Sequence, residues 1–396
     1  MKKRIFSTLI LVLLATSLLV ACGPAKPDLS GTITIWHSLK DVEIEALNNV
    51  ITAYQVDQPN VQFELLFVPD DDLRGKFETA AAVGEGPDIL IGSDDWGPAM
   101  YDALLVADVS SLGSKVFNKI HAGALAEGSY KDVQVGIPYN LKGVIMYRNS
   151  DIIADAASSF DDLVTKAEAA TSGDTYGALL EIGAFFSYGH LYGLGGSLMD
   201  AGGNPTFNTP EGEAWLEMLV TFAELGAEPW YTDNEVTLFK EGKAGIIIDG
   251  TWNLDPILQE IGDSLVIDPW PKGMSGFVQS KYVFLNANTS GAAADAALDF
   301  MAHMVSVDAQ TSFAETDPGF LPVTDGVEVA DSLRQQALTA MAGGVAFPVI
   351  PEMGVYWGPM ETAIRTVVDE GTDPAVSLQT AYDSVVAALD EMHAGQ

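Results

Sequence analysis

Apolar and polar positions follow one another in a regular order after residue 30 of the 396-residue chain. Residues 31–36 alternate apolar and polar side chains, which is typical of a β-strand with one buried face. Residues 41–56 place apolar side chains at the spacing of an amphipathic helix. A strand at 61–68, a helix at 70–83 and a strand at 88–91 continue the pattern. This β-α-β-α-β order predicts a doubly wound parallel sheet, whose ligand loops lie beyond the carboxyl ends of the strands.

The rest of the chain predicts a second α/β unit that is richer in helix. Residues 133–149 contain an apolar strand, then Gly136 and Pro138, then a second apolar strand. Their position between two α/β units suits a crossing from one lobe to another. Residues 244–252 form a buried strand and a loop that ends in Trp252. The other predicted elements are strands at 265–268 and 282–286 and helices at 161–170, 209–225, 235–241, 292–305, 310–316, 328–342 and 355–396.

The first 23 residues have the layout of a secretory signal peptide. A basic start at 2–4 precedes an apolar run at 5–20, which is shorter than the roughly 20 residues that cross a bilayer. The following Leu-Val-Ala-Cys-Gly, in which the cysteine is Cys22, resembles a bacterial lipobox. The resemblance implies that 1–22 are a lipoprotein signal peptide and the lipidated Cys22, and that 23–30 are a linker. The protein would then lie outside the cytoplasm, lipid-anchored to the cell membrane, in the periplasm or on the cell surface.

The composition restricts what the rest of the protein can be. Nineteen basic residues face 55 acidic ones, a net charge of −36 that becomes −39 without the three basic residues of the signal peptide. This charge argues against nucleic acid, because phosphate contacts need basic side chains, and against other anionic ligands. Apolar residues make up 48% of the chain, and about 370 residues follow the signal peptide, which predicts two domains. Cys22 is the only cysteine, so no disulfide framework is possible.

Six local patterns along the chain together resemble the solute-binding proteins of bacterial ABC sugar importers (family 1). This branch includes the maltose- and malto-oligosaccharide-binding proteins. The patterns are ITIWHS, GEGPDILIGSDDWG, GIPYNLKGVIMYRN, LFKEGKAGIIIDGTWN, PGFLPV and IPEMGVYWGPMETAIRTVVDEGTDPAVSLQTAYDSV. No single pattern is specific to the family, but the patterns occur in its order and spread over nearly all of the chain beyond the signal peptide.

The resemblance implies an α/β, two-lobed, periplasmic-binding-protein-like fold of type II, in which crossing hinge strands join discontinuous lobes that close on a ligand. It places the N-terminal lobe at 31–140 and 286–327 and the C-terminal lobe at 144–280 and 328–396. The protein would be a monomer that binds without catalysis and without a cofactor. It would deliver a neutral oligosaccharide, maltose- or maltodextrin-like, to ABC permease subunits in the membrane.

A sugar needs flat aromatic surfaces for its C–H faces and polar side chains for its hydroxyls. Asp95, Trp252 and Trp357 are of these types and match the loops in which the family's maltose binders place a carboxylate and two stacking rings. The resemblance also implies ligand contacts in the first loop, at the crossing and in an aromatic region of the second half. These further candidates are Trp36, Lys40, Asp41, Trp96, Tyr139, Phe185, Phe186 and Tyr188.

Two positions depart from the maltose-binding pattern. Asp95 is followed by Trp96 where those binders typically carry arginine, and Lys142 stands near the place of a glutamate. Trp96 either lengthens a stacking platform or packs beneath the loop. Trp36 either contacts the ligand or packs in the core. The run Asp70-Asp71-Asp72 is interpreted as a helix cap and not as part of a site.

Two alternatives come from other classes of protein. An extracellular carbohydrate-active hydrolase needs a pair of carboxylates, but the neighbouring Asp94 and Asp95 have no controlled separation. Neither a G-x-S-x-G elbow nor a G-x-x-x-x-G-K-[ST] loop occurs. The five histidines are scattered without ligand spacing, so no metal site is predicted. A lipid-anchored carbohydrate adhesin would differ from a transport receptor in showing no hinge closure with free sugar.

Overall fold

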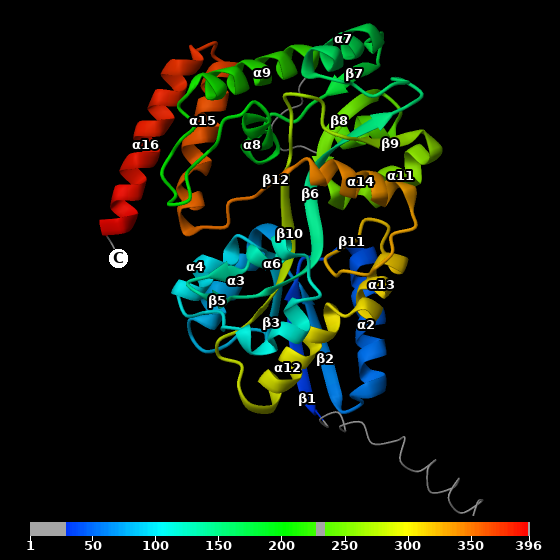
Figure 1. The fold of residues 1–396 in the computed structure, drawn as a ribbon, viewed down its shortest axis with the longest axis vertical. Helices are drawn as coiled ribbons and strands as arrows, with labels where there is room; N and C mark the ends of the chain where they lie inside the picture. The colour runs from blue at the N-terminus through cyan, green and yellow to red at the C-terminus, as the bar shows by residue number, and fades with distance from the viewer. Residues whose placement is uncertain (1–28, 227–233, 395–396) are drawn as a thin grey trace, which may run out of the picture.

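Two lobes are stacked along the long axis of the molecule, and two strands run through both of them (Figure 1). The computed structural model describes residues 29–226 and 234–394. The strands shared by the lobes are β6 (Ile137–Asn149) and β10 (Phe277–Leu285), which pair with each other in antiparallel fashion. The predicted signal peptide, Cys22 and most of the predicted linker lie outside the described residues. Within the described residues, no helix is long and apolar enough to cross a membrane.

The first lobe confirms the predicted parallel α/β unit. β1 (Gly31–His37) lies between β2 (Val61–Phe67) and β3 (Ile89–Ser93), and it pairs with both in parallel. Helices α2 (Asp41–Asp57) and α3 (Asp70–Ala81) connect these strands. β10 pairs with β3, and β6 pairs with β10, so two antiparallel strands complete this part of the sheet.

In the second lobe the far half of β6 lies between two antiparallel neighbours. These are β8 (Ala244–Gly250) and β9 (Leu265–Asp268), and β7 (Tyr176–Leu179) pairs in parallel with β8. Helices α15 (Trp357–Val368) and α16 (Pro374–Ala394) lie side by side at the end of the chain.

The remaining elements cover the two lobes. The helices are α4 (Trp96–Asp102), α5 (Ser114–Phe117), α6 (Ala122–Ala126), α7 (Phe160–Ala170), α8 (Ala184–Gly193), α9 (Pro210–Gly226), α10 (Asn234–Lys240), α11 (Leu254–Ile261), α12 (Gly291–Met304), α13 (Val307–Thr316) and α14 (Ser332–Ala342). The short strands are β4 (Ser129–Tyr130), β5 (Val133–Gln134), β11 (Leu321–Pro322) and β12 (Val345–Ala346). Single 3₁₀ turns lie at Ser110–Leu112, Thr251–Asn253, Gly262–Ser264 and Pro351–Val355.

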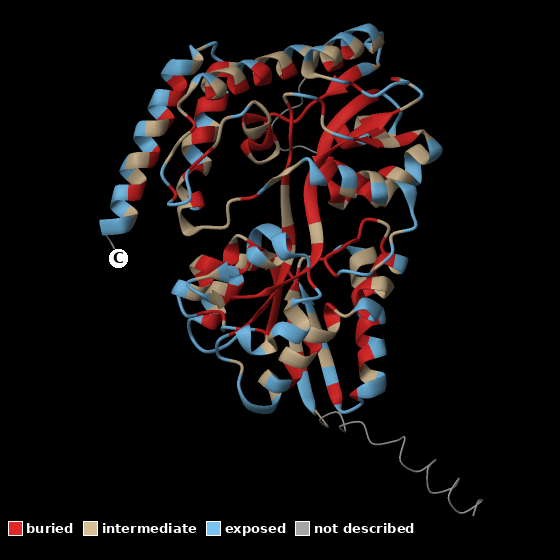
Figure 2. Cartoon of the chain, in the orientation of Figure 1, coloured by how far each residue is buried: buried red, intermediate tan, exposed pale blue. Residues whose placement is uncertain are grey.

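Each lobe has its own apolar core. Strands and the inward faces of helices are buried, whereas the outward faces of the helices are exposed (Figure 2). In the first lobe Ile33 and Phe300 belong to a cluster between the sheet and helices α2, α12 and α13. In the second lobe Met146 and Trp215 belong to a separate cluster that includes residues of α8, α9, α15 and α16. The residue boundaries that the family resemblance implies for the lobes stay a prediction.

Three predicted elements differ from those observed. The two strands predicted within residues 133–149 are observed as β5 and β6, but β6 already begins at Ile137 and includes Pro138. A register shift between Lys281 and Tyr282 lies opposite this proline, which has no N–H to donate. β10 begins at Phe277 rather than at 282, since its first residues pair with β6 and β12. The helix predicted from 355 is divided into α15 and α16, between which Gly371 adopts a φ of +67°.

A buried ion pair fastens β6 to β9 in the second lobe. Arg148 Nε donates to Asp268 Oδ2 at 2.6 Å, and Nη2 donates to Oδ1 at 3.0 Å. The remaining nitrogen, Nη1, donates to the carbonyl oxygens of Ile153 and Ala154 at 2.8 and 2.9 Å. The two charged side chains are 7% and 3% exposed, so neither charge has water as an alternative partner.

We expect Asp268→Ala to lower the free energy of unfolding by about 3–5 kcal/mol, because it leaves a buried guanidinium without its counter-charge. Urea unfolding followed by circular dichroism measures this change. The matched control is Asp102→Ala, which removes the partner of the exposed Lys131 and should have a much smaller effect. Equal effects of the two substitutions would contradict the prediction.

Candidate functional site

A cavity of about 610 Å³ lies between the lobes, and both lobes and both shared strands line it. Its residues come from the carboxyl ends of β1 and β3, the starts of α2 and α3, the middle of β6 and β10, and loops of the second lobe. From the first lobe these are Ser38, Lys40, Glu43, Asp70, Asp71, Ser93, Asp95 and Trp96; from β6 and β10, Lys142, Gln279 and Lys281; from the second lobe, Phe185, Trp252, Phe347 and Trp357.

Four aromatic rings form the second lobe's wall of the cavity. The ring of Phe185 lies in the middle, with centroids 6.1 Å from Trp252, 6.1 Å from Phe347 and 6.5 Å from Trp357. Phe347 and Trp357 are stacked with an interplanar angle of 17°. Apart from Phe347 the rings are half-buried, so they keep faces that a ligand can cover.

The first lobe's wall is polar and acidic. The Ser38 hydroxyl donates to Asp70 Oδ1 at 2.5 Å, and Lys281 Nζ lies 3.3 Å from the same oxygen. Asp70 and Asp71 line the cavity, so the interpretation of this run as a helix cap only is wrong; the cap residue of α3 is Pro69. Burial raises the pKa of Asp95, against the opposing effect of the Arg74 and Lys281 charges.

The floor of the cavity carries a buried ion pair. Lys142 Nζ on β6 lies 3.0 Å from Glu43 Oε1 on α2, and the two side chains are 4% and 15% exposed. Glu43 also accepts the backbone N–H of Lys40 at 2.8 Å. Burial alone would raise the pKa of Glu43, but the Lys142 ammonium and this hydrogen bond bring it below its usual value. A carboxylate thus reaches the cavity from α2, beside the lysine that departs from the maltose-binding pattern.

A hydrogen bond beside the cavity joins the first lobe to the second. Lys40 Nζ, before α2, donates to Asn253 Oδ1 at 3.3 Å, in the turn that carries Trp252. Asn253 is itself held by Asp249, whose Oδ2 accepts its amide at 2.7 Å. The contact therefore links the first lobe to the turn that carries one ring of the aromatic wall.

Two glycines let indole rings lie flat against strand ends. A Cβ at Gly250 would come within 2.1 Å of the Trp252 ring, and one at Gly92 within 2.3 Å of the Trp96 ring. Trp96 is 8% exposed and also lines the cavity, so it both packs beneath its loop and offers an edge to the ligand. The close backbone approach requires glycine at both positions.

A buried acidic pair lies beneath the loop that carries Asp95. Asp94 Oδ1 accepts the backbone N–H of Asp95 at 2.9 Å, and Oδ2 accepts that of Ser280 on β10 at 3.2 Å. Burial, with the nearby carboxylate of Glu127, raises the pKa of Asp94 well above its usual range. Burial also raises the pKa of Glu127 to about 7. The pair therefore binds protons more readily in the folded protein than in the unfolded chain.

The structure brings together most of the candidates from the sequence. Lys40, Asp95, Trp96, Phe185, Trp252 and Trp357 line the cavity, and Asp41 lines an adjoining one.

Four further candidates do not line either cavity, so the structure does not support them as ligand contacts. Trp36 packs against a buried apolar cluster of the first lobe, and Lys76 Nζ lies 4.9 Å from the centre of its ring. Tyr139 is 2% exposed and packs against Phe313 and Phe320. Tyr188 is fully buried and stacks beneath Trp357. Phe186 packs against Phe185 and Trp252, but it does not line the cavity.

Several lining residues were not predicted. Glu43 and Lys281 lie within an amphipathic helix and a strand, where a charged residue is ordinarily solvent-exposed, so they carried no sequence signal. Phe347 follows two glycines in a segment without periodicity. From the sequence, Lys142 stands out only as a departure from the family pattern, and Asp70 and Asp71 only as part of a helix cap.

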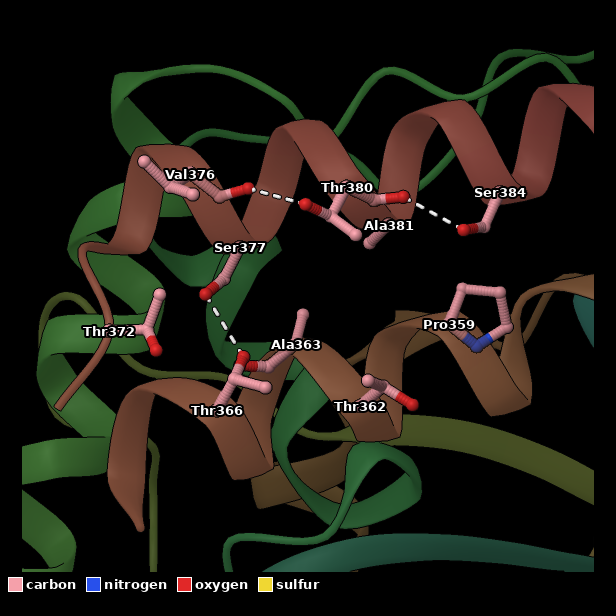
Figure 3. A pocket seen from close by; sticks show the side chains of 10 residues that line it. All are labelled: Pro359, Thr362, Ala363, Thr366, Thr372, Val376, Ser377, Thr380, Ala381 and Ser384. Atoms are coloured by element: carbon pink, nitrogen blue, oxygen red, sulfur yellow. Dashed lines mark hydrogen bonds between the residues drawn. The ribbon is translucent and has the colours of Figure 1, made fainter. Parts of the chain in front are cut away.

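A second hollow, of about 310 Å³, lies between α15 and α16 (Figure 3). It is lined largely by hydroxyls, but these bond within the helix pair. Thr380 and Ser384 donate to the carbonyl oxygens of Val376 and Thr380, each at 2.9 Å, and Thr366 and Ser377 lie 3.0 Å apart. The hollow therefore offers a ligand few unused polar groups.

In the described part of the chain, no cluster of three or more His, Cys, Asp or Glu could hold a metal ion.

Comparison with known proteins points to one family. The family model described as bacterial extracellular solute-binding protein matches residues 49–341. The maltotriose-binding protein of Pyrococcus abyssi is 23% identical over 362 residues, which cover 86% of this chain and 78% of the relative. The galactooligosaccharide-binding protein of Bacillus subtilis is 22% identical, with 96% of each chain covered. The maltotriose-bound maltose/maltodextrin-binding domain of Bdellovibrio bacteriovorus superposes with a TM-score of 0.80 at 22% identity, covering 91% of this chain and 100% of that one.

Gly250→Ala should lower the free energy of unfolding by about 1–3 kcal/mol, because the methyl group overlaps the Trp252 ring and forces it from its place. The backbone at Gly250, with φ −83° and ψ 157°, suits alanine, so the ring contact alone causes the loss. Urea unfolding measures the stability, and tryptophan fluorescence reports the environment of the Trp252 ring. Gly75→Ala, at a helical glycine with open space around it, is the control and should be neutral or stabilising. A stable variant with unchanged fluorescence would contradict the overlap.

The stability of the protein should fall as the pH rises from about 4.5 to about 7, the interval between the ordinary and the folded pKa of Glu127. Because the folded state binds the proton more tightly, its stabilisation is complete below this interval and is lost above it. Glu127→Gln stays neutral, so it should reduce the slope and raise the stability at pH 8 relative to the parent protein. Urea midpoints across this pH range measure both effects. Glu45→Gln, on the exposed face of α2, serves as the control, and an unchanged slope in Glu127→Gln would refute the assignment.

Proposed function

Because the chain belongs to the bacterial extracellular solute-binding proteins, we propose that it is the receptor of an ABC importer and captures an oligosaccharide between its lobes. The observation that carries this proposal is the pairing of two unlike walls across one cavity. Aromatic rings line the second lobe's side, and carboxylates and ammonium groups line the first lobe's side.

These walls suit the two kinds of surface on a sugar. The C–H faces of a pyranose can stack on Trp252 and Trp357, and such contacts contribute roughly 0.5–1.5 kcal/mol each beyond area burial. Its hydroxyls can donate to Asp71 and Asp95, for whose carboxylates the described residues provide no ion pair, and can accept from Lys281. Maltotriose and galactooligosaccharides in the names of the relatives support this ligand class. We favour a maltodextrin-like ligand, in keeping with the maltotriose-bound structural neighbour.

Ligand capture follows from the arrangement of the lobes. A sugar gains contacts to both walls only when the lobes approach, so it stabilises the closed arrangement relative to the open one. β6 and β10 connect the lobes and provide Lys142, Gln279 and Lys281 at the cavity floor. Lys40 of the first lobe donates a hydrogen bond to Asn253 of the second lobe at 3.3 Å, a contact that would favour the closed arrangement.

The same proposal includes the place of the protein in the cell. The lipobox-like end of the apolar run supports a lipid anchor at Cys22 and a position outside the cytoplasm. From there, a single copy of the closed receptor would dock on the permease subunits in the membrane. The receptor binds its sugar without altering it, so a malto-oligosaccharide should be recovered intact after incubation.

Trp252→Ala and Trp357→Ala should each weaken the binding of maltotriose by about 1–3 kcal/mol, because each removes a ring from the aromatic wall. Isothermal titration calorimetry measures the affinity, and circular dichroism confirms that the variants fold. Trp270→Phe is the matched control, since this indole packs on His190 away from the cavity.

Unchanged maltotriose affinity in both alanine variants would remove these rings from the site. A thermal-shift panel of maltose, maltotriose, galactooligosaccharides, cellobiose and xylobiose identifies the preferred sugar, since a ligand that binds only the folded state raises the unfolding temperature.

A further inference from the structure

Helices α8 and α15 each bring a ring to the aromatic wall of the cavity. Phe185 belongs to the first turn of α8 and Trp357 to the first turn of α15, and their ring centroids lie 6.5 Å apart. Tyr188, one turn further along α8, stacks beneath Trp357 with the centroids 5.7 Å apart. Because Trp357 packs on two rings of α8, a shift of this helix relative to α15 would displace the wall. The surface offered to a sugar therefore depends on how these two helices are held together.

The amino end of α8 has no capping side chain of its own. Its cap residue is Gly183, which cannot accept a hydrogen bond through a side chain from the first turn. Glu361 of α15 supplies an acceptor instead, since its Oε1 accepts the backbone N–H of Ala184, the first residue of α8, at 2.9 Å. Glu181 accepts the N–H of Gly183 at 2.8 Å, but it lies two residues earlier in the same segment. Of these two hydrogen bonds, the one from Ala184 to Glu361 is the one that connects α8 to α15.

Glu361 and Trp357 are one helical turn apart on α15. Residues at this spacing lie on the same face of a helix. One face of α15 therefore presents an indole to the cavity and a carboxylate to the residue that precedes Phe185. A carboxylate at this end of α8 also interacts favourably with the helix dipole. Glu361 lines neither of the two adjoining cavities, so it is placed to hold the wall and not to contact the sugar.

We propose that Glu361 is a positioning residue for sugar binding, which fixes the start of α8 against α15 and so holds the Phe185 ring beside Trp357. This inference rests on the proposed function and adds to it a residue outside the cavity on which the affinity depends. Without the carboxylate, the N–H of Ala184 loses its acceptor, and the first turn of α8 is free to move. Each sugar that binds would then have to order the Phe185 ring again, which costs affinity.

Isothermal titration calorimetry of the full chain tests the proposal, with maltotriose or with the panel sugar that gives the largest thermal shift. Glu361→Ala should weaken binding about tenfold, because one ring of the stacking wall loses its place. Glu361→Gln should stay within about threefold of the parent protein, since the amide keeps an oxygen for the N–H of Ala184. The control is Glu370→Ala, at an exposed position just beyond α15, which should leave the affinity unchanged. Circular dichroism confirms that each variant folds.

A double-mutant cycle separates positioning from a general structural role. Phe185→Ala removes the ring that Glu361 is proposed to hold. In this background Glu361→Ala should therefore weaken binding by no more than about twofold. A merely structural role would lower the affinity by the same factor with and without the ring. Equal losses in the two backgrounds, or a Glu361→Gln variant that binds as weakly as Glu361→Ala, would overturn the proposal.

The position of the ring is followed in the sugar-free protein by fluorine NMR after incorporation of a fluorinated phenylalanine. The Phe185 signal is assigned by its loss in Phe185→Leu. In Glu361→Ala this signal should shift or broaden, whereas in Glu361→Gln and Glu370→Ala it should stay in place. An unchanged signal in Glu361→Ala would also overturn the proposal. If no sugar of the panel binds the parent protein, the proposed function fails, and the NMR comparison alone then decides the role of Glu361.

Discussion

The antiparallel pairing of β6 with β10 is the constraint on which the rest of the structure depends. Lys142 and Gln279 face each other in register across this pair, and both side chains line the cavity. The floor of the site is thus the connection between the lobes. Any change in the angle between the lobes bends these strands and moves the two walls relative to the floor. In the proposed receptor, ligand contacts and lobe closure would therefore be coupled through the backbone hydrogen bonds of this strand pair.

The two walls carry different chemistry because different local structures present them. Parallel strands end at the first lobe's wall, and the helices that follow begin there, which places short polar and acidic side chains at the cavity. The second lobe presents rings from a helix start, a 3₁₀ turn and an irregular segment. Four of the charged groups around the cavity are paired, as Glu43–Lys142 and Asp70–Lys281. Although the protein is acidic, the cavity therefore presents less unpaired charge to a neutral sugar.

A site residue could be predicted from the sequence where its side chain suits a sugar and it also follows the end of a strand. Asp95 and Trp252 both follow buried strands, and both line the cavity. Tyr139 and Tyr188 are also polar aromatics in the expected regions, but they are buried beneath the surface, because residue type does not tell which face a side chain takes. The ring of Phe347 reaches the cavity from a segment with no readable pattern, where only packing decides.

By itself, the sequence determined the order of strands and helices, the parallel unit of the first lobe and the acidic, apolar-rich character of the chain, because these follow from neighbours a few residues apart. The tertiary structure alone decided how segments around residues 40, 95, 142, 252 and 357 meet at one cavity. It also decided that Glu43 pairs with Lys142. These contacts join residues far apart in the chain, and they arise only when two separately packed cores are set on the same pair of strands.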